Sequence, residues 1–141
     1  MQRQGCQDIR ELCDKIRQTA YDIHVYHAHG HLEKVYENAL AHRLRKTGIK
    51  VQQQHPLSVL DEDGTSLGNY YADLWVDERL VVELKAVRAI APEHISQLLG
   101  YLRASRCEHG LLINFGSPRF YIRKYVLSQS AAPMESMDAF C

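Results

Sequence analysis

The sequence contains no long hydrophobic run, and its few cysteines follow no metal-binding or disulfide pattern. No stretch reaches the roughly eighteen consecutive apolar residues that a membrane-spanning helix needs. The N-terminal residues include no apolar segment that could act as a signal peptide. The cysteines lack CxxC spacing and matched partners, so we interpret them as free thiols: Cys6, Cys13, Cys107 and Cys141. We therefore expect a cytoplasmic protein.

An excess of one charge is also missing, because 17 Lys and Arg residues balance 17 Asp and Glu residues. No global field draws the chain to nucleic acid or to an anionic membrane, so any nucleic-acid binding must be local. With 141 residues and 45% hydrophobic content, the chain can form one globular domain with a real core. We expect this domain at 1–127, with an N-terminal helix at 8–26 packed on it and a flexible tail at 128–141.

The stretch from Tyr70 to Ala86 predicts a β-hairpin around which the chain is organised. A register with 77–79 as a three-residue loop places Asp73 opposite Glu83 and Tyr71 opposite Lys85. Because side chains alternate along a strand, the other face is wholly apolar: Ala72, Leu74, Val76, Leu80, Val82 and Leu84. Two carboxylates that face each other across a strand pair repel, and a bound cation would remove the conflict. The alternative is a half-exposed hairpin with scattered surface charge.

A helix predicted from Leu32 to Thr47 carries two further acids. Its apolar arc contains Leu32, Val35, Tyr36, Ala39, Leu40 and Leu44, and Gly48 suits the left-handed position that follows a helix. Glu33 falls within the edge of this arc, and Glu37 lies just beyond it. One interpretation is that one of the two points toward the hairpin carboxylates. The other is that Glu33 complements the helix dipole and Glu37 is solvated.

The rest of the chain predicts one more helix and further strands. Strands are expected at 49–60, where Pro56 marks an edge or a break, and from Leu67 into the hairpin. A helix begins at Pro92 and carries Gln97 and Tyr101 as a polar pair beside its buried stripe. Strands follow at 110–115 and 119–127. The last contains a basic cluster that could contact phosphates or be a solvated face: Arg119, Arg123 and Lys124.

Four histidines surround Gly30: His24, His27, His29 and His31. Histidine is the commonest metal-binding side chain, which raises the possibility of a zinc site. Zinc sites usually combine paired ligands at set spacing with cysteine or carboxylate partners. We interpret the cluster as a turn rich in exposed histidine.

Taken in order, these motifs resemble the PD-(D/E)XK nuclease superfamily and, within it, the GxxExxY family of small proteins. The resemblance covers Ala20 to Leu127 and is carried by GHLEKVY from Gly30, YYADLWV, LVVELKAV, APEHISQLLGYLRA and GLLINFGSPR. It implies an α/β fold, a restriction-endonuclease-like core in which a mixed central sheet (αβββαβ) is flanked by helices. Two departures are Ala72 in place of a common proline, and His27-Ala-His-Gly30 in place of the usual LGPG turn.

The resemblance also implies roles for individual residues. Asp73 and Glu83 would bind a catalytic divalent metal, Mg²⁺ or Mn²⁺, and Lys85 would assist the nucleophile. The helix acid that shares metal binding maps to Glu37, whose spacing resembles the ExxLxxxLxxxG of Holliday-junction resolvases, and Glu33 is a second participant. Gln97 and Tyr101 match the QxxxY element of the lambda-exonuclease and RecB-like branch, where these residues shape the site and contact substrate.

We expect from this a metal-dependent nuclease that acts on nucleic acid, with DNA as the favoured substrate. The basic cluster of Arg119, Arg123 and Lys124 would contact that substrate. One alternative is a nuclease-fold binding or adaptor protein that binds metal or nucleic acid without cleavage. Another is a structural or oligomerising α/β protein, which a Glu37 pointing away from Asp73 and Glu83 would favour. Because the net charge is zero, a homodimer or a protein partner would help in binding long duplexes.

Overall fold

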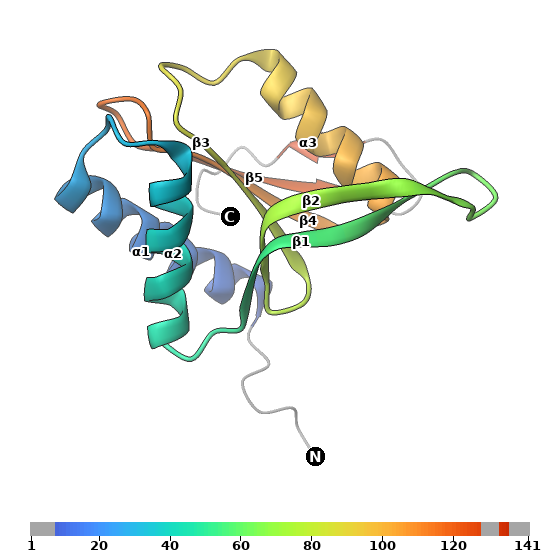
Figure 1. The fold of residues 1–141 in the computed structure, drawn as a ribbon, viewed down its shortest axis with the longest axis horizontal. Helices are drawn as coiled ribbons and strands as arrows, with labels where there is room; N and C mark the ends of the chain where they lie inside the picture. The colour runs from blue at the N-terminus through green and yellow to red at the C-terminus, as the bar shows by residue number, and fades with distance from the viewer. Residues whose placement is uncertain (1–7, 128–132, 136–141) are drawn as a thin grey trace.

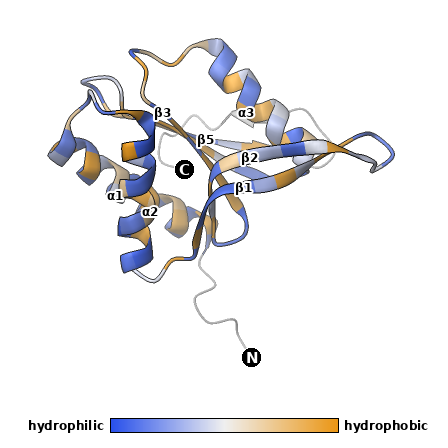
Figure 2. Cartoon of the chain, viewed as in Figure 1, coloured by the Kyte–Doolittle hydropathy of each residue, from blue (hydrophilic) through white to orange (hydrophobic). Residues whose placement is uncertain are grey.

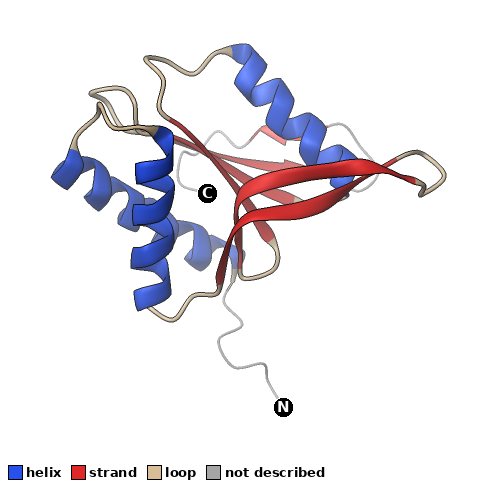
Figure 3. Cartoon of the chain, viewed as in Figure 1, coloured by secondary structure: helices blue, strands red, loops and turns tan. Residues whose placement is uncertain are grey.

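The computed structural model describes residues 8–127 and 133–135. The elements follow one another along the chain as two helices, three strands, a helix and three strands (Figures 1 and 3). They are α1 (Ile9–His27), α2 (Glu33–Lys46), β1 (Val51–Leu60), β2 (Ser66–Val76), β3 (Leu80–Lys85), α3 (Pro92–Ser105), β4 (His109–Asn114), β5 (Tyr121–Leu127) and β6 (Pro133–Glu135).

The strands form one mixed sheet in the order β1-β2-β3-β4-β5-β6. All neighbours are antiparallel except β3 and β4, which run parallel and are connected through α3. This is the predicted mixed sheet flanked by helices. Pro56 lies in the edge strand β1, where a missing backbone donor is tolerated. The short strand β6 was not predicted, and the remainder of the expected tail, 128–132 and 136–141, lies outside the described residues.

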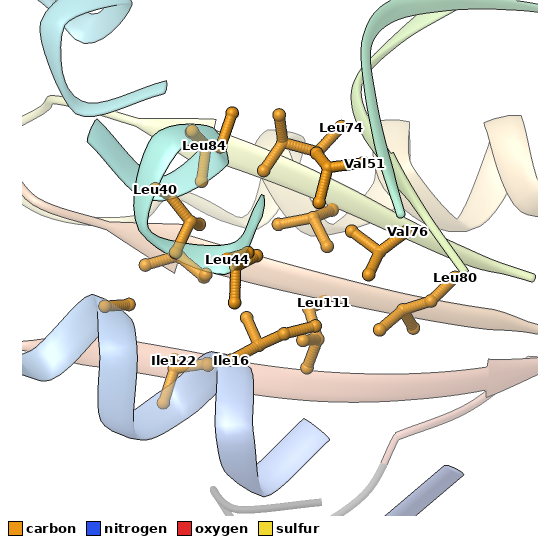
Figure 4. Close-up of a cluster of buried hydrophobic side chains, with 14 of the residues drawn as sticks. Ile16, Leu40, Leu44, Val51, Leu74, Val76, Leu80, Leu84, Leu111 and Ile122 are labelled. Carbon is orange, nitrogen blue, oxygen red and sulfur yellow. The ribbon is translucent and has the colours of Figure 1, made fainter. Parts of the chain in front are cut away.

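Helices cover both faces of the sheet (Figure 1). α1 and α2 enclose one apolar cluster with β2, β3 and β4, and ten of its residues are labelled in Figure 4. α3 packs on the opposite face, where Leu98 and Leu102 join a second cluster with Val81 and Leu112. Hydrophobic and hydrophilic segments alternate along α1 and α2, whereas the turn between β1 and β2 is hydrophilic (Figure 2). No helix among the described residues is both long enough and apolar enough to cross a bilayer.

The predicted hairpin register is confirmed for the three residue pairs next to the loop. Leu74 pairs with Val82, Trp75 with Val81 and Val76 with Leu80, which leaves 77–79 as the loop. Five of the six apolar residues lie in the α1/α2 cluster, but Ala72 belongs to the α3 cluster, so the prediction was wrong for that residue. The idea of a half-exposed hairpin was also wrong, because α3 covers the second face and Val81 is fully buried.

The orientation of α2 differs from the prediction. Leu32 and Val35 are 78% and 41% exposed, whereas Glu37 is only 3% exposed. The buried face of the helix consists of Tyr36, Glu37, Leu40, Ala41 and Leu44. The buried face of α2 is therefore rotated toward Glu37. The prediction from apolar residues alone was wrong for the first turn of the helix, where Leu32 and Val35 are exposed.

Candidate active site

The hydrogen-bond ladder between β2 and β3 ends at Leu74 and Val82. Beyond it, backbone N–H groups donate to side-chain carboxylates. The Asp73 N–H donates to Oε2 of Glu83 at 3.2 Å, and the Leu84 N–H donates to Oδ2 of Asp73 at 2.8 Å. Each carboxylate thus accepts a backbone hydrogen bond from the other strand. The predicted pairs of Asp73 with Glu83 and of Tyr71 with Lys85 are not part of this ladder. In the parallel ladder with β4, Glu83 pairs with Leu112 and Lys85 pairs with Asn114.

β1 interrupts its pairing at the same level of the sheet. Gln53 pairs with Leu74 and His55 pairs with Ala72, but Gln54 between them adopts a left-handed φ of 50°. The irregular backbone turns the Gln54 side chain toward the acids. Its Nε2 donates to Oε1 of Glu37 at 2.9 Å and approaches Oδ1 of Asp73 at 3.2 Å. Gln54 therefore bridges the helix acid and the first hairpin acid.

Glu37 is nearly buried and points into the seam between α2 and the sheet. Besides Gln54, its carboxylate accepts hydrogen bonds from Nε2 of Gln53 at 2.8 Å and from Nζ of Lys34 at 3.0 Å. A buried carboxylate is tolerated only when such donors satisfy it. Glu37 does not point away from the hairpin acids, which removes the observation that would have favoured a purely structural α/β protein.

Tyr70 completes the surroundings of Glu83. Its hydroxyl donates a hydrogen bond to Oε2 of Glu83, and its ring stacks on Tyr101 of α3 with centroids 3.8 Å apart. Burial, followed by the Glu83 charge, raises the pKa of Tyr70 well above its ordinary value, so it remains a donor. The predicted residue Tyr101 thus reaches the acids through Tyr70. Sequence reasoning missed Tyr70 because strict alternation assigns positions 70 and 73 to opposite faces.

Gln53 and Gln54 were also missed. The only sequence signal was a run of three glutamines, Gln52 to Gln54, in a strand whose pattern gave them no partner. Their partners come from α2 and β2, which the strand pattern by itself does not bring together.

Burial and neighbouring charge raise the pKa of both hairpin acids. Burial raises the pKa of Glu83 to about 7, with the Asp73 charge as the next cause, while the hydrogen bond from Tyr70 works against the rise. Burial also raises the pKa of Asp73, to which the Glu37 charge contributes, against the hydrogen bond from Leu84. Asp73 and Glu83 are therefore close together and partly shielded from water. A bound cation would stabilise their ionised forms.

Lys85 and Glu33 lie within electrostatic reach of these acids. Partial burial and then the Asp73 charge raise the pKa of Glu33, and the Lys85 charge opposes them. The Lys85 charge likewise lowers the pKa of both Asp73 and Glu83. Among the described residues, the Lys85 ammonium has no hydrogen-bond or ion-pair partner, so it is available to a ligand.

The donor set fits a hard divalent cation held by two carboxylates. Asp73 and Glu83 offer oxygen ligands, and Oε1 of Glu83 accepts no hydrogen bond from the described part of the chain. Mg²⁺ commonly takes one or two protein carboxylates and keeps several waters. Within residues 8–127 and 133–135, no three or more His, Cys, Asp or Glu side chains are grouped to hold a metal. Glu37 accepts hydrogen bonds from three donors, one of which, Gln54, also donates to Asp73.

The remaining predicted site residues are Gln97 on α3 and the basic cluster. Gln97 is exposed on α3 and has no hydrogen-bond partner in the described segments. Arg119 and Arg123 line one pocket together. Lys124 is not brought together with them: it is 6% exposed, and its charge, after burial, lowers the pKa of His109.

The histidines form no common site. His24 is buried, and its Nε2 contacts the carbonyl of Ser117 at 2.8 Å, so the interpretation as an exposed turn was wrong for this residue. His29 and His31 are exposed as expected, and the His31 ring contacts those of His27 and Tyr36 edge-on. The absence of a metal-holding group among the described residues applies to these histidines too.

A family model described as the PD-(D/E)XK nuclease superfamily matches residues 10–125, which run from α1 into β5. The matched segment includes Glu37, Asp73, Glu83 and Lys85. No curated protein and no solved structure matches the chain.

Proposed function

The chain belongs to the PD-(D/E)XK nuclease superfamily, and from this premise we propose that it is a metal-dependent nuclease that hydrolyses phosphodiester bonds in nucleic acid, with DNA as the favoured substrate. One observation carries the proposal. Where the β2–β3 ladder ends, the Asp73 N–H donates to the Glu83 carboxylate and the Leu84 N–H donates to the Asp73 carboxylate. Gln54 connects Asp73 to the helix acid Glu37. Lys85 lies within electrostatic reach of both hairpin acids.

Asp73 and Glu83 would hold the metal, Mg²⁺ or Mn²⁺. When bound, such an ion supplies Lewis-acid charge stabilisation and lowers the pKa of a coordinated water. For the two residues to act as ligands they must be ionised, so the proton that Glu83 retains up to a pKa of about 7 has to leave. Tyr70 favours this loss because its hydrogen bond stabilises the Glu83 carboxylate.

Lys85 would act on the reacting groups themselves. Its ammonium would donate hydrogen bonds to the attacking water and to a non-bridging phosphate oxygen, and its charge would offset the negative charge that develops in the transition state. Glu37 would serve as a positioning residue, because it holds Gln54 against Asp73. Glu33 would meet the substrate at the rim of the site, together with Gln97 and Tyr101 from α3.

We also propose that the chain belongs to the GxxExxY family within the superfamily. The spacing of Gly30, Glu33 and Tyr36 has a structural basis. Gly30 has a φ of 118°, which L side chains rarely adopt. The Tyr36 hydroxyl donates to the Ala28 carbonyl at 2.6 Å and accepts from the His31 N–H at 3.1 Å. Gly30 and Tyr36 thus stabilise the turn before α2. This turn determines where the helix that carries Glu33 and Glu37 begins.

The proposal is tested by incubating the purified protein with single-stranded DNA, duplex DNA and RNA in Mg²⁺ or Mn²⁺. The variants Asp73→Ala and Lys85→Ala should each lose activity by about 100-fold or more, since the first removes a ligand of the metal and the second removes the positive charge that acts on the reacting phosphate. Asp14→Ala and Lys46→Ala remove the same charges from exposed helix positions and should retain activity. Cleavage that survives both site substitutions, or that appears on no substrate, would contradict the proposal.

A second candidate is a nuclease-fold protein that binds metal or nucleic acid without cleaving. It is favoured by the protein donors that already engage both oxygens of Asp73 and both oxygens of Glu37, because a carboxylate held in this way is less available to a catalytic ion. Calorimetric titration with Mn²⁺, followed by the cleavage assay on the same sample, separates the two. Metal binding without cleavage on any of the three substrates would support this second function.

A further inference from the structure

A pocket of about 630 Å³ lies beyond the end of β3, and its lining includes Asn114, the strand partner of Lys85. Four arginines from three separate parts of the chain line it: Arg17 of α1, Arg88 after β3, and Arg119 and Arg123 around the start of β5. Its lining residues, all within the described part of the chain, include no Asp or Glu. Pockets of this size hold small ligands or parts of larger ones.

The four arginines line one hollow that has no acidic side chain in its lining, so an anion would offset their positive charge. Arg88 and Arg119 are exposed, and neither side chain has a hydrogen-bond or ion-pair partner in the described segments. The planar guanidinium group matches the geometry of phosphate and can bind it with two parallel hydrogen bonds. The charge of the pocket therefore favours a phosphate group.

Aromatic rings share the lining with the arginines. Tyr21 is 47% exposed, and its ring meets that of Phe120 edge-on with centroids 5.7 Å apart. The Tyr121 ring has the Arg123 guanidinium at 6.0 Å from its centroid. Positive charge beside exposed aromatic faces is the combination that binds single strands, in which the phosphates contact cations and the unstacked bases lie on rings.

The pocket is connected rigidly to the proposed catalytic lysine. Arg88 follows Lys85 by three residues, so their Cα atoms lie within about 11 Å, the fully extended reach of three residues. Asn114 pairs with Lys85 across β3 and β4, and its side chain fixes Val87 by accepting from its N–H at 3.0 Å and donating to its carbonyl at 2.9 Å. Even at the 3.4 Å rise per nucleotide of a stacked strand in duplex DNA, this separation spans no more than about three nucleotides.

We propose that this pocket binds a nucleotide of single-stranded DNA a few positions from the bond to be cut. Arg88 and Arg119 hold its phosphate, and Tyr21 provides a face for its base. The inference rests on the proposed function for its substrate class and makes that substrate a single strand. A duplex end enters the site only after its terminal bases have separated.

The test measures binding of a fluorescent 20-nucleotide single strand by anisotropy, in chelator so that no hydrolysis occurs. The double variant Arg88→Ala/Arg119→Ala should raise the Kd about tenfold and reduce the slope of log Kd against log salt by about 0.7 for each phosphate that the protein no longer neutralises. Arg103→Ala, which removes an exposed arginine from α3, should change the Kd less than twofold. Equal Kd values for the double variant and Arg103→Ala would overturn the proposal, as would a wild-type protein that does not bind the strand at low salt.

The base contact has its own pair of variants on one helix. Tyr21→Leu should weaken single-strand binding about fivefold or more, whereas Tyr26→Leu, at a position 77% exposed, should not. A fully paired blunt duplex of the same sequence should respond to neither. Equal weakening of duplex and single strand by Tyr21→Leu would overturn the base contact.

The same samples separate this inference from the proposed function. Lys85→Ala should abolish cleavage in Mg²⁺ or Mn²⁺, whereas Arg88→Ala/Arg119→Ala should weaken single-strand binding in chelator, where no hydrolysis occurs. Loss of binding in the double variant, combined with no cleavage by any form of the protein, would support the pocket and reject the nuclease. Cleavage that is lost in Lys85→Ala but unchanged in the double variant, with unchanged binding, would support the nuclease and reject the pocket.

Discussion

The Glu83 carboxyl has a pKa raised to about 7, first because it is buried and then because Asp73 lies beside it. An acid that is harder to ionise in the folded protein binds its proton more tightly there than in the unfolded chain. Between its ordinary value of 4.5 and about 7, the folded state therefore holds more protons. The free energy of unfolding consequently falls as the pH rises through that window, and the contribution is present in full below it.

Replacement of this single group tests the linkage. Glu83→Gln keeps an oxygen for the hydrogen bonds from Tyr70 and Asp73 but cannot ionise. We expect the metal-free variant to be more stable than the wild type at pH 8 by roughly 1–3 kcal/mol, and to show a flatter stability profile between pH 4.5 and 7. Urea unfolding at pH 5 and at pH 8 measures the difference.

Glu62→Gln provides the control, because Glu62 is exposed in the turn between β1 and β2. It should follow the wild-type stability at both pH values. A wild-type profile that is as flat as that of Glu83→Gln would show that the proton on Glu83 is not coupled to folding.

At the scale of elements, the site depends on three pieces of secondary structure that meet at irregular backbone. The β2–β3 ladder stops at Leu74 and Val82, and β1 departs from regular geometry at Gln54. If the β2–β3 ladder continued, the N–H groups of Asp73 and Leu84 would donate to backbone carbonyls of the opposite strand. They donate instead to the carboxylates of Glu83 and Asp73. The Gln54 amide instead ties β1 to α2 through Glu37 and to β2 through Asp73.

Removal of that bridge should therefore weaken the connection between α2 and the sheet. In Gln54→Ala, buried Glu37 loses one of its three donors, which should lower the free energy of unfolding by about 1–2 kcal/mol. Activity should fall as well, because Asp73 is no longer held. Urea unfolding and the cleavage assay report the two effects.

Gln52→Ala is the matched control, since Gln52 lies on the same strand and its side chain has no hydrogen-bond partner within the described ranges. Its stability and activity should remain near those of the wild type. If both variants lose the same stability, strand propensity rather than the bridge explains the loss.

At the scale of the whole molecule, two apolar layers on opposite faces of one sheet hold the acids in place. The α1/α2 cluster contains Leu74 and Leu84, the neighbours of Asp73 and Glu83 along their strands. The α3 cluster contains Tyr70, the donor to Glu83. Because close packing fixes both layers, the acids are brought together before any ligand arrives, and a bound cation should stabilise the fold as a whole.

Metal should accordingly raise the melting temperature. With Mg²⁺ or Mn²⁺ at about 100 times its Kd, mass action adds about 2.7 kcal/mol, which corresponds to a rise of roughly 5–10 °C for a chain of this size. Asp73→Asn/Glu83→Gln should melt at the same temperature with and without metal, whereas Glu11→Gln/Asp14→Asn, both on the exposed side of α1, should respond like the wild type. Thermal melts monitored by circular dichroism measure this, and a metal-induced rise that persists in the site variant would assign the ion to another place.

The sequence by itself determined the local elements and the register of the hairpin. Only one pairing around the 77–79 loop collects the apolar residues of both strands, and the structure contains that pairing, with Val76 facing Leu80. Pro92 at the start of α3 and the apolar run of β4 were equally visible, because each follows from a single residue type or a short pattern. The order of the motifs also pointed to the superfamily whose model matches residues 10–125.

Only the tertiary structure decided which side chains meet. Helical periodicity placed Leu32 inside and Glu37 at the margin, whereas Leu32 is 78% exposed and Glu37 is buried. A carboxylate can be buried there because Gln53 and Gln54 arrive from another strand to satisfy it. The arginine pocket likewise collects residues from three distant segments. Periodicity describes one element at a time, whereas hydrogen-bond satisfaction and charge compensation depend on neighbours that only the folded chain supplies.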